Sequence, residues 1–333
     1  MARSLSIPEA MMKNFSYTRA GSLAEAIKAL STKGARLHAG GTDLLGCLRD
    51  EILDVEKVVS ISGLKNLKGI SQRTDGGLKI GALTVLADIA ANPSVAQKYP
   101  VLAQAAASVG TPQIRAQGTI GGNLCQRPRC WYYRSDLVCF KKGGGTCYGM
   151  GGESQYHAIF GGGPCFAVHP SDLAVALVAL QAQISVAGPS GSRTVKADGF
   201  FIGPDKSLDK ENILMPGEIL TAVQIPPAGV NVKSSYRKLR TRGSWDFAQT
   251  SVAAVLLFNE DTIQSARIVL GGVAPLPWRL QAAEKLLTGK KLDGGLAAAV
   301  AEAAALGANP LKDNGYKVQM VKGSVEESIL GFM

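Results

Sequence analysis

The chain of 333 residues lacks a hydrophobic run long enough to cross a membrane. The apolar stretch at residues 173–180 is far shorter than the ~20 residues that a spanning helix needs, so we expect no membrane span. The first residues also lack the apolar core of a secretory signal peptide. We therefore expect no signal peptide, and residues 1–11 are expected to form a loose extension before Met12.

The sequence also lacks a nucleic-acid-binding motif, although its formal net charge is +10. Lys and Arg are scattered along the chain, and the densest group lies at residues 236–242, near an expected domain start. Without an accompanying motif, such a charge does not indicate binding to nucleic acid. A basic surface that faces an anionic cofactor or an acidic partner is the better interpretation.

Histidine and cysteine are both scarce. The three histidines, His38, His157 and His169, are dispersed, and none lies in a metal-binding or nucleophile motif, so a hydrolytic triad has no support. Six cysteines are too few for a disulfide scaffold in a chain of this length. Five of the six fall within residues 125–165, and this clustering favours a metal site.

Regular structure is indicated on both sides of this cluster. Residues 22–31 predict a helix because Ser22 and Glu25 have capping-box spacing before an apolar stripe. Residues 171–180 predict a buried helix, apolar nearly all round and capped by Ser171 or Asp172. Residues 225–229 resemble a linker, and the strands expected at 251–258 and 265–271 with a helix at 293–306 predict a separate α+β domain.

Residues 110–163 show no clear periodicity and are too many for an ordinary loop. They hold Cys130, Cys139 and Cys147, and Cys165 follows just beyond them. Four thiolates suit either one iron–sulfur cube or one tetrahedral zinc. Structural zinc sites favour closely paired cysteines, whereas these four have only long spacings, which favours iron–sulfur. Cys47 is expected to be structural, and the spacing leaves Cys125 open as a further ligand.

Two glycine-rich turns precede the cysteines. Gly40 and Gly41 with Thr42, and Gly121 and Gly122 with Thr119 and Asn123, could bring backbone N–H groups against phosphate oxygens. Neither turn matches the Rossmann or P-loop pattern, and purely structural turns use the same residue types. The two turns by themselves therefore indicate a nucleotide site only weakly.

Four segments carry a resemblance to a known family. They are Ala39-Gly-Gly-Thr-Asp-Leu-Leu45, Gln113-Ile-Arg-Ala-Gln-Gly-Thr-Ile-Gly-Gly-Asn123, His169-Pro-Ser-Asp172 and Leu214-Met-Pro-Gly-Glu-Ile219. Together they closely resemble the FAD-binding subunit of the molybdenum hydroxylases, the family of xanthine dehydrogenase, aldehyde oxidoreductase and carbon monoxide dehydrogenase. The resemblance runs in order from about residue 12 to residue 330. It implies an α+β fold: a PCMH-type FAD-binding domain in two parts, residues 1–62 and 63–228, and a smaller α+β C-terminal domain, residues 232–333.

The cysteine-rich insert, residues 124–168, narrows the resemblance. It is similar to the insert of 4-hydroxybenzoyl-CoA reductase and of bacterial periplasmic aldehyde oxidoreductases, whose FAD subunits carry an additional [4Fe-4S] cluster. The resemblance implies that the cluster ligands are Cys130, Cys139, Cys147 and Cys165. Cys125 falls where these relatives need no cysteine, so the resemblance makes it a non-ligand.

The resemblance also implies the residues that bind FAD. Arg36, Leu37, His38, Ala39, Gly40, Gly41, Thr42, Asp43 and Leu44 would line the diphosphate. Gly110 and Thr111 would approach the flavin, and Thr119, Gly121, Gly122 and Asn123 would close the phosphate loop. Asp172 would hold the adenosine end with Ile219 packed near it, and Lys238 would contribute from the C-terminal domain.

The implied protein is an electron-transfer subunit with no catalytic acid or base. Its partners would be a molybdenum-cofactor-binding large subunit and a [2Fe-2S] small subunit, in a heterotrimer or a dimer of heterotrimers, and FAD would pass electrons to an external acceptor. We expect a mainly structural role for the [4Fe-4S] cluster. Two alternatives are a stand-alone PCMH-type flavin oxidase or reductase and a zinc-braced binding module without redox activity. The cytoplasm and the periplasm are both compatible, because a partner's signal could export the complex.

Overall fold

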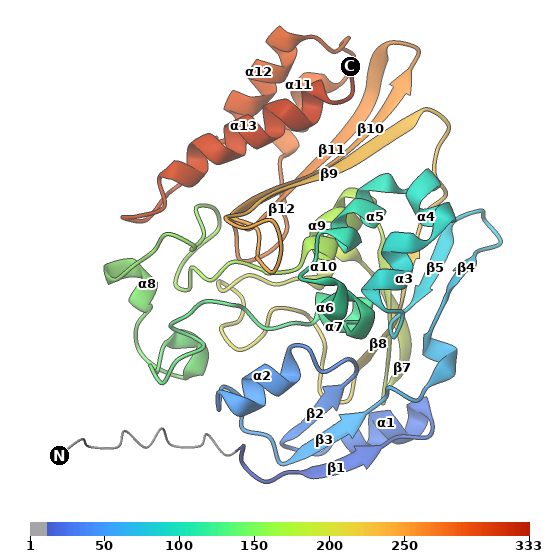
Figure 1. The fold of residues 1–333 in the computed structure, drawn as a ribbon, viewed down its shortest axis with the longest axis vertical. Coiled ribbons are helices and arrows are strands. Elements are labelled where there is room, and N and C mark those ends of the chain that lie inside the picture. Colours follow the sequence, from blue (N-terminus) through green and yellow to red (C-terminus); the bar gives the residue numbers. More distant parts are fainter. Residues whose placement is uncertain (1–11) are drawn as a thin grey trace.

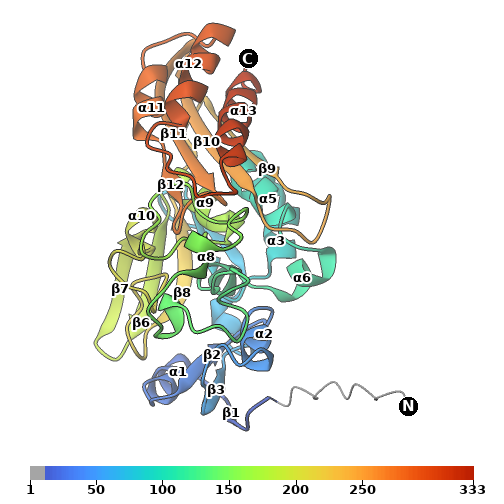
Figure 2. The same ribbon diagram turned by 90° about the vertical axis from the view of Figure 1, so that its left-hand side faces the viewer.

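The computed structural model describes residues 12–333, and the extension expected at residues 1–11 lies outside them. Three β-sheets form three tiers along the long axis of the molecule, each with its own helices (Figures 1 and 2). The N-terminal tier lies at the bottom in Figure 1 and the C-terminal tier at the top. In the described part of the chain, no helix combines the length and apolar character that a membrane crossing requires.

The N-terminal tier is a parallel sheet of three strands in the order β1-β3-β2. Its elements are β1 (Ser16–Arg19), α1 (Leu23–Leu30), β2 (Ala35–His38), α2 (Leu44–Arg49) and β3 (Lys57–Ser60). Helix α1 begins where the spacing predicted, because the Ser22 hydroxyl accepts a hydrogen bond from the Glu25 backbone N–H. Strand β2 ends at the first glycine turn, and α2 leads away from it.

The middle tier is an antiparallel sheet of five strands in the order β4-β5-β8-β6-β7. Its elements are a 3-10 turn (Lys65–Leu67), β4 (Ile70–Gln72), β5 (Leu78–Gly81), α3 (Leu86–Ala91), α4 (Pro93–Lys98), α5 (Pro100–Ala107), α6 (Pro112–Gln117), α7 (Ile120–Leu124), α9 (Asp172–Ala179), β6 (Gln183–Gly188), β7 (Gly191–Lys196), α10 (Ala197–Phe200) and β8 (Ile219–Ile225). Every residue of α9 is buried, as its sequence predicted, and Ser171 caps it. Helix α9 packs against α5, α7, β10 and β11, so it joins this tier to the C-terminal one.

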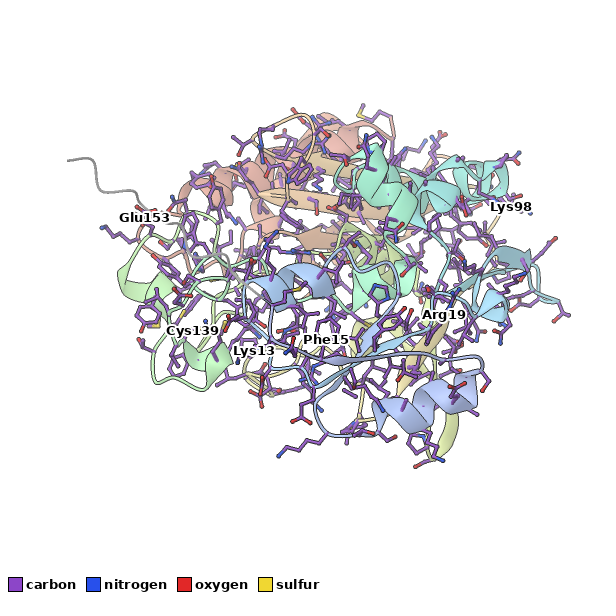
Figure 3. All side chains as sticks on the ribbon, turned by 60° about the horizontal axis from the view of Figure 1, so that its bottom comes forward. Lys13, Phe15, Arg19, Lys98, Cys139 and Glu153 are labelled. Atoms are coloured by element: carbon purple, nitrogen blue, oxygen red, sulfur yellow. The ribbon has the colours of Figure 1, made fainter. Side chains whose placement is uncertain are left out.

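The cysteine-rich insert leaves the middle tier after α7 and returns at α9. Its regular structure consists of a 3-10 turn (Phe140–Lys142) and the short helix α8 (Tyr148–Gly151). The insert is the green lobe at the left of Figure 1, and Figure 3 shows its Cys139 on the opposite side of the molecule from Lys98, the last residue of α4.

The C-terminal tier is an antiparallel sheet in the order β12-β11-β10-β9 with three helices on one face. Its elements are β9 (Val232–Leu239), β10 (Thr250–Asn259), β11 (Thr262–Gly271), β12 (Trp278–Arg279), α11 (Gln281–Leu287), α12 (Gly294–Ala304) and α13 (Tyr316–Leu330). Apolar side chains of β10, β11 and these helices form one buried core. The strands and the helix predicted here are present, and α13 is an element that the sequence did not reveal.

Candidate cofactor site

Two adjoining cavities lie between the N-terminal and middle tiers and the insert. The larger has a volume of about 410 Å³ and the smaller about 180 Å³. Both are lined by Thr42 and Asp43 from the first glycine turn and by Thr119 and Gly122 from the second. The two glycine turns, far apart in the sequence, therefore meet at the junction of the cavities. Their combined size is within the range of sites for cofactors.

The first turn depends on glycine at two positions. A Cβ on Gly40 would lie 2.1 Å from the backbone oxygen of Gln117, so the turn packs directly against the end of α6. Gly41 has a φ of +75°, which favours glycine because side chains with a Cβ rarely adopt it. The turn therefore presents bare backbone to the cavity, as the close approach of a phosphate requires.

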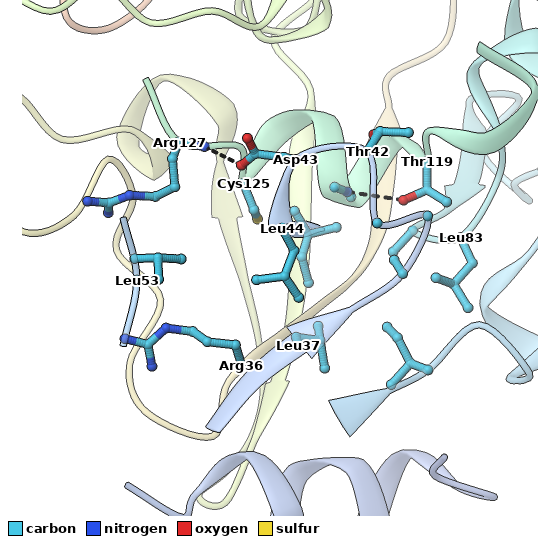
Figure 4. Close-up of a pocket in the computed structure, with 18 of the residues that line it drawn as sticks. Arg36, Leu37, Thr42, Asp43, Leu44, Leu53, Leu83, Thr119, Cys125 and Arg127 are labelled. Atoms are coloured by element: carbon cyan, nitrogen blue, oxygen red, sulfur yellow. Dashed lines mark hydrogen bonds between the residues drawn. The ribbon is translucent and has the colours of Figure 1, made fainter. Parts of the chain in front are cut away.

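The second turn is held by its own threonine. The Thr119 hydroxyl accepts a hydrogen bond from the Gly122 backbone N–H at 3.2 Å, which Figure 4 marks. The Gly121 backbone N–H donates to the Ala82 carbonyl at 2.9 Å. The apolar walls of the larger cavity come from Leu37 and Leu83, among others. This cavity thus combines glycine backbone at one end with an apolar wall.

A buried charged pair borders the smaller cavity. Asp172 at the start of α9 accepts a hydrogen bond from the Lys238 ammonium at 2.8 Å and another from the Tyr236 hydroxyl at 2.5 Å. Burial, and then the Asp172 charge, raises the pKa of Tyr236 well above its usual value. Gly110 lines the same cavity. Asp172 and Gly110 therefore lie at one end of the site, whereas the resemblance implied opposite ends.

Most of the expected FAD-binding residues line the two cavities. The larger cavity is lined by Arg36, Leu37, Ala39, Gly40, Gly41, Thr42, Asp43, Leu44, Thr119, Gly121 and Gly122, and the smaller also by Gly110, Asn123, Asp172 and Lys238.

Three expected residues do not line either cavity. The His38 ring lies beside the Ser60 hydroxyl at 3.3 Å, and Thr111 instead caps α6 by accepting a hydrogen bond from the Ile114 backbone N–H. Ile219 is buried in the core of the N-terminal tier. The next residue, Leu220, lines the larger cavity instead, because successive residues of a strand point to opposite sides.

Several lining residues had not been expected from the sequence. Arg127, Lys141 and Asp209 border the larger cavity, and a loop that carries Trp245 and Phe247 borders the smaller. They come from segments without periodicity or a phosphate-binding pattern, so no local signal marks them. They reach the cavities only because the tertiary fold places these distant segments beside them.

The insert is fastened to the first glycine turn through Asp43. One carboxylate oxygen of Asp43 accepts from Arg129 at 2.9 Å and from Arg134 at 2.8 Å. The other oxygen accepts from the Arg127 backbone N–H at 2.8 Å, as Figure 4 shows. The Asp43 side chain is therefore occupied by the insert, while its position at the turn still borders both cavities.

The four expected ligand cysteines meet in the insert. One small cavity is lined by Cys130, Cys139, Cys147 and Cys165, together with aromatic side chains that include Tyr133. Burial raises the pKa of the Cys130 thiol to about 11. The four thiols are thus held together around one space.

No group of three or more His, Cys, Asp or Glu side chains within residues 12–333 lies close enough to hold a single metal ion. The four thiols surround a cavity instead of converging on one point. Lys141 lines both this cavity and the larger one, so the two sites are neighbours. The smaller cavity shares no residue with the cysteine cavity.

The other two cysteines do not line this cavity, although Cys47 packs in one apolar cluster with Cys130 and Cys139. Cys47 is buried in a small apolar cluster with Ile52 and Tyr133 and is close to the Arg134 guanidinium, in line with the expected structural role. Cys125 lines the larger cavity and not the cysteine cavity, and burial raises its pKa to about 12. Its position agrees with a cysteine that is not a cluster ligand.

Comparison with known protein families gives two matches that cover nearly the whole chain. Residues 13–228 match the FAD binding domain in molybdopterin dehydrogenase, and residues 234–328 match the CO dehydrogenase flavoprotein C-terminal domain. The first match alone spans well over half of the chain.

Individual proteins are similar over the same length. The aldehyde oxidoreductase FAD-binding subunit PaoB of Escherichia coli K12 is 38% identical, over 93% of this chain and 96% of that protein. The glyceraldehyde dehydrogenase medium chain of Sulfolobus acidocaldarius is 31% identical, over 92% and 94%. Among solved structures, a chain of carbon monoxide dehydrogenase from Hydrogenophaga pseudoflava superposes with a TM-score of 0.77 at 28% identity, covering 96% of this chain and 97% of that one.

Proposed function

This chain belongs to the FAD-binding subunits of the molybdenum hydroxylase family, and from that premise we propose that it holds both FAD and a [4Fe-4S] cluster. It is an oxidoreductase subunit whose role is electron transfer. When bound, FAD exchanges electrons singly or in pairs, so it can link one-electron carriers to an external acceptor. The protein itself binds and orients the cofactor and shields it from water.

The two adjoining cavities suit the two ends of FAD. We assign the diphosphate to their junction, where both glycine turns present backbone and Gly40 leaves no room for a side chain. The apolar wall around Leu37 and Leu83 suits the adenine, which places the adenosine in the larger cavity. The flavin ring then takes the smaller cavity beside Gly110, with the Asp172–Lys238 pair next to it.

The observation that carries the cluster proposal is that four thiols from separate loops line one small cavity. Four cysteine thiolates are the ligand set of a [4Fe-4S] cluster. A single zinc ion needs its ligands about 2.3 Å from one point, whereas no three candidate ligands in the described residues meet around one ion. The donor set and its arrangement around a space therefore favour a cluster over zinc.

The loop-rich insert supports a mainly structural role for the cluster. The cysteine cavity adjoins the larger cavity through Lys141, and Arg129, next to Cys130, borders the smaller one, where we place the flavin ring. Meanwhile the insert carries little regular structure of its own. Four Fe–S bonds would fix a segment that otherwise has few hydrogen-bonded elements.

We further propose that the chain works with a molybdenum-cofactor-binding large subunit and a [2Fe-2S] small subunit in an aldehyde- or xanthine-type complex. Similar proteins are a FAD-binding subunit of an aldehyde oxidoreductase and medium chains of glyceraldehyde dehydrogenase and carbon monoxide dehydrogenase. Substrate oxidation would occur on the large subunit, and electrons would reach the FAD of this chain through the small one. A chain that purifies alone and turns over a substrate by itself would instead be a stand-alone flavin enzyme.

The test is an absorption spectrum of protein purified without oxygen, with iron, sulfide and zinc measured on the same sample. The proposal predicts flavin bands over a broad iron–sulfur absorption near ~400 nm and about four irons per chain, the number that four thiolates hold. Flavin without iron would contradict the cluster and leave the FAD assignment intact. Zinc without flavin would favour a zinc-braced binding module.

A further inference from the structure

One histidine lies directly against a proposed cluster ligand. The Nε2 atom of His157 is 3.3 Å from the sulfur of Cys130, and the imidazole is buried. Within residues 12–333, this is the one side-chain hydrogen bond that reaches any of the four proposed ligand sulfurs. His157 is not one of the residues that the family resemblance implied.

The imidazole is held in place from several sides. The His157 carbonyl accepts hydrogen bonds from the Lys317 ammonium at 3.2 Å and from the Asn314 amide at 3.0 Å, two groups at the start of α13. On the other side, a Cβ on Gly149 would lie 2.7 Å from Nε2, so the helix that follows Cys147 packs directly against the ring. The C-terminal tier thus fixes the backbone, and the insert fixes the ring.

The second ring nitrogen, Nδ1, indicates which tautomer the imidazole adopts. Nδ1 is buried and has no hydrogen-bond partner among the described residues. A neutral imidazole carries one N–H donor and one acceptor, and a thiolate sulfur bound to iron can only accept. The tautomer with the proton on Nε2 places the donor on the Cys130 sulfur and leaves the unpaired acceptor at Nδ1.

We propose that His157 donates its Nε2–H to the sulfur of Cys130 and thereby raises the reduction potential of the cluster, as a positioning residue for that ligand. Hydrogen bonds to ligand sulfurs withdraw charge from the cluster, which favours its reduced form. They also fix the ligand's orientation, as outer partners of metal ligands generally do. This inference rests on the proposed function, since it requires the cluster to be present.

A packing role is the alternative explanation. The ring lies 5.9 Å from that of Tyr132 and 6.3 Å from that of Trp131, so it also belongs to an aromatic cluster over the cysteine cavity. Two variants separate the explanations. His157→Phe keeps a flat ring and removes the donor, whereas His157→Gln removes the ring and keeps an N–H donor at similar reach.

The experiment measures iron per chain and the midpoint potential of the [4Fe-4S] signal by electron paramagnetic resonance on the purified complex. His157→Phe should make reduction of the cluster about tenfold less favourable, which is about 59 mV for one electron, because the hydrogen bond to the Cys130 sulfur is stronger when the reduced cluster carries more negative charge. His157→Gln should stay close to the unchanged protein. Loss of iron from the phenylalanine variant alone would support the same donor role.

Three results would overturn the inference. An unchanged potential in His157→Phe at full iron content would show that the hydrogen bond has no effect. Equal shifts, or equal loss of iron, in both variants would show that packing of the ring is what matters. An unchanged protein that contains FAD and no iron would remove the cluster itself, and this outcome is recognised before any variant is made.

Discussion

Lys317 allows a quantitative test, because its side chain in α13 is fully buried and has no carboxylate partner within residues 12–333. It donates hydrogen bonds to two backbone carbonyls, those of His157 and Gly272. Burial lowers its pKa from 10.5 to about 7. We therefore expect that replacing it with methionine removes a pH dependence from the stability of the folded chain.

The direction and magnitude of this pH dependence follow from the linkage between proton binding and folding. Between pH 7 and 10.5 the unfolded chain binds a proton at Lys317 that the folded chain does not, so stability rises with pH across this window. Below pH 7 Lys317 is protonated in both states, and its buried charge lowers the free energy of unfolding by the full amount. At about 1.4 kcal/mol for each unit of pKa shift, the free energy of unfolding changes by roughly 5 kcal/mol between pH 7 and 10.5.

The assay is urea unfolding followed by circular dichroism at several pH values between 6 and 9.5, for the unchanged chain and for Lys317→Met. The free energy of unfolding of Lys317→Met is subtracted from that of the unsubstituted chain at each pH, which cancels the contributions of the other titrating groups. This difference should rise by about 1.4 kcal/mol per pH unit above pH 7. A difference that stays constant with pH would refute the assigned proton behaviour of Lys317.

Three further substitutions test the site. Gly40→Ala should weaken FAD retention by about tenfold or more, because its Cβ would collide with a carbonyl of α6. Flavin per chain is the readout, and Gly323→Ala, which meets open space, is the control. Asp172→Asn should cost about 3–5 kcal/mol in thermal unfolding, since it leaves the Lys238 charge buried without an opposite charge. A loss below about 1 kcal/mol would contradict that. Asp43→Asn should loosen the insert, because it weakens the contacts with Arg129 and Arg134, and trypsin should then cleave faster within residues 130–165. An unchanged cleavage rate would show that these contacts do not hold the insert in place.

Capping residues and apolar patterns in the sequence predicted those helices whose ends or burial depend on neighbouring residues in the chain. Ser22 with Glu25 marked the start of α1, and the uninterrupted apolar run of α9 marked a buried helix. Helix α13 was missed because its apolar residues are interrupted by glycine, serine and lysine, and because its Lys317 is buried against expectation. Burial of a lysine depends on carbonyls supplied by distant segments.

The site was predictable as far as its motifs extend. The glycine turns and the four cysteines were found in the sequence, and the structure brings each set to one cavity. The loop with Trp245 was not found, because its place at the smaller cavity depends on how the C-terminal tier packs. Leu220, and not Ile219, lines the larger cavity, because successive residues of a strand point to opposite sides. The domain boundaries remain predictions.

The smaller cavity has walls from two parts of the chain that match separate family models. Gly110 and Asp172 lie in the first, and Lys238 and Trp245 lie in the second. A fragment ending at residue 228 would therefore keep both glycine turns and still have an open pocket where we place the ring. Exchange of C-terminal portions between relatives would therefore change the walls of this pocket directly.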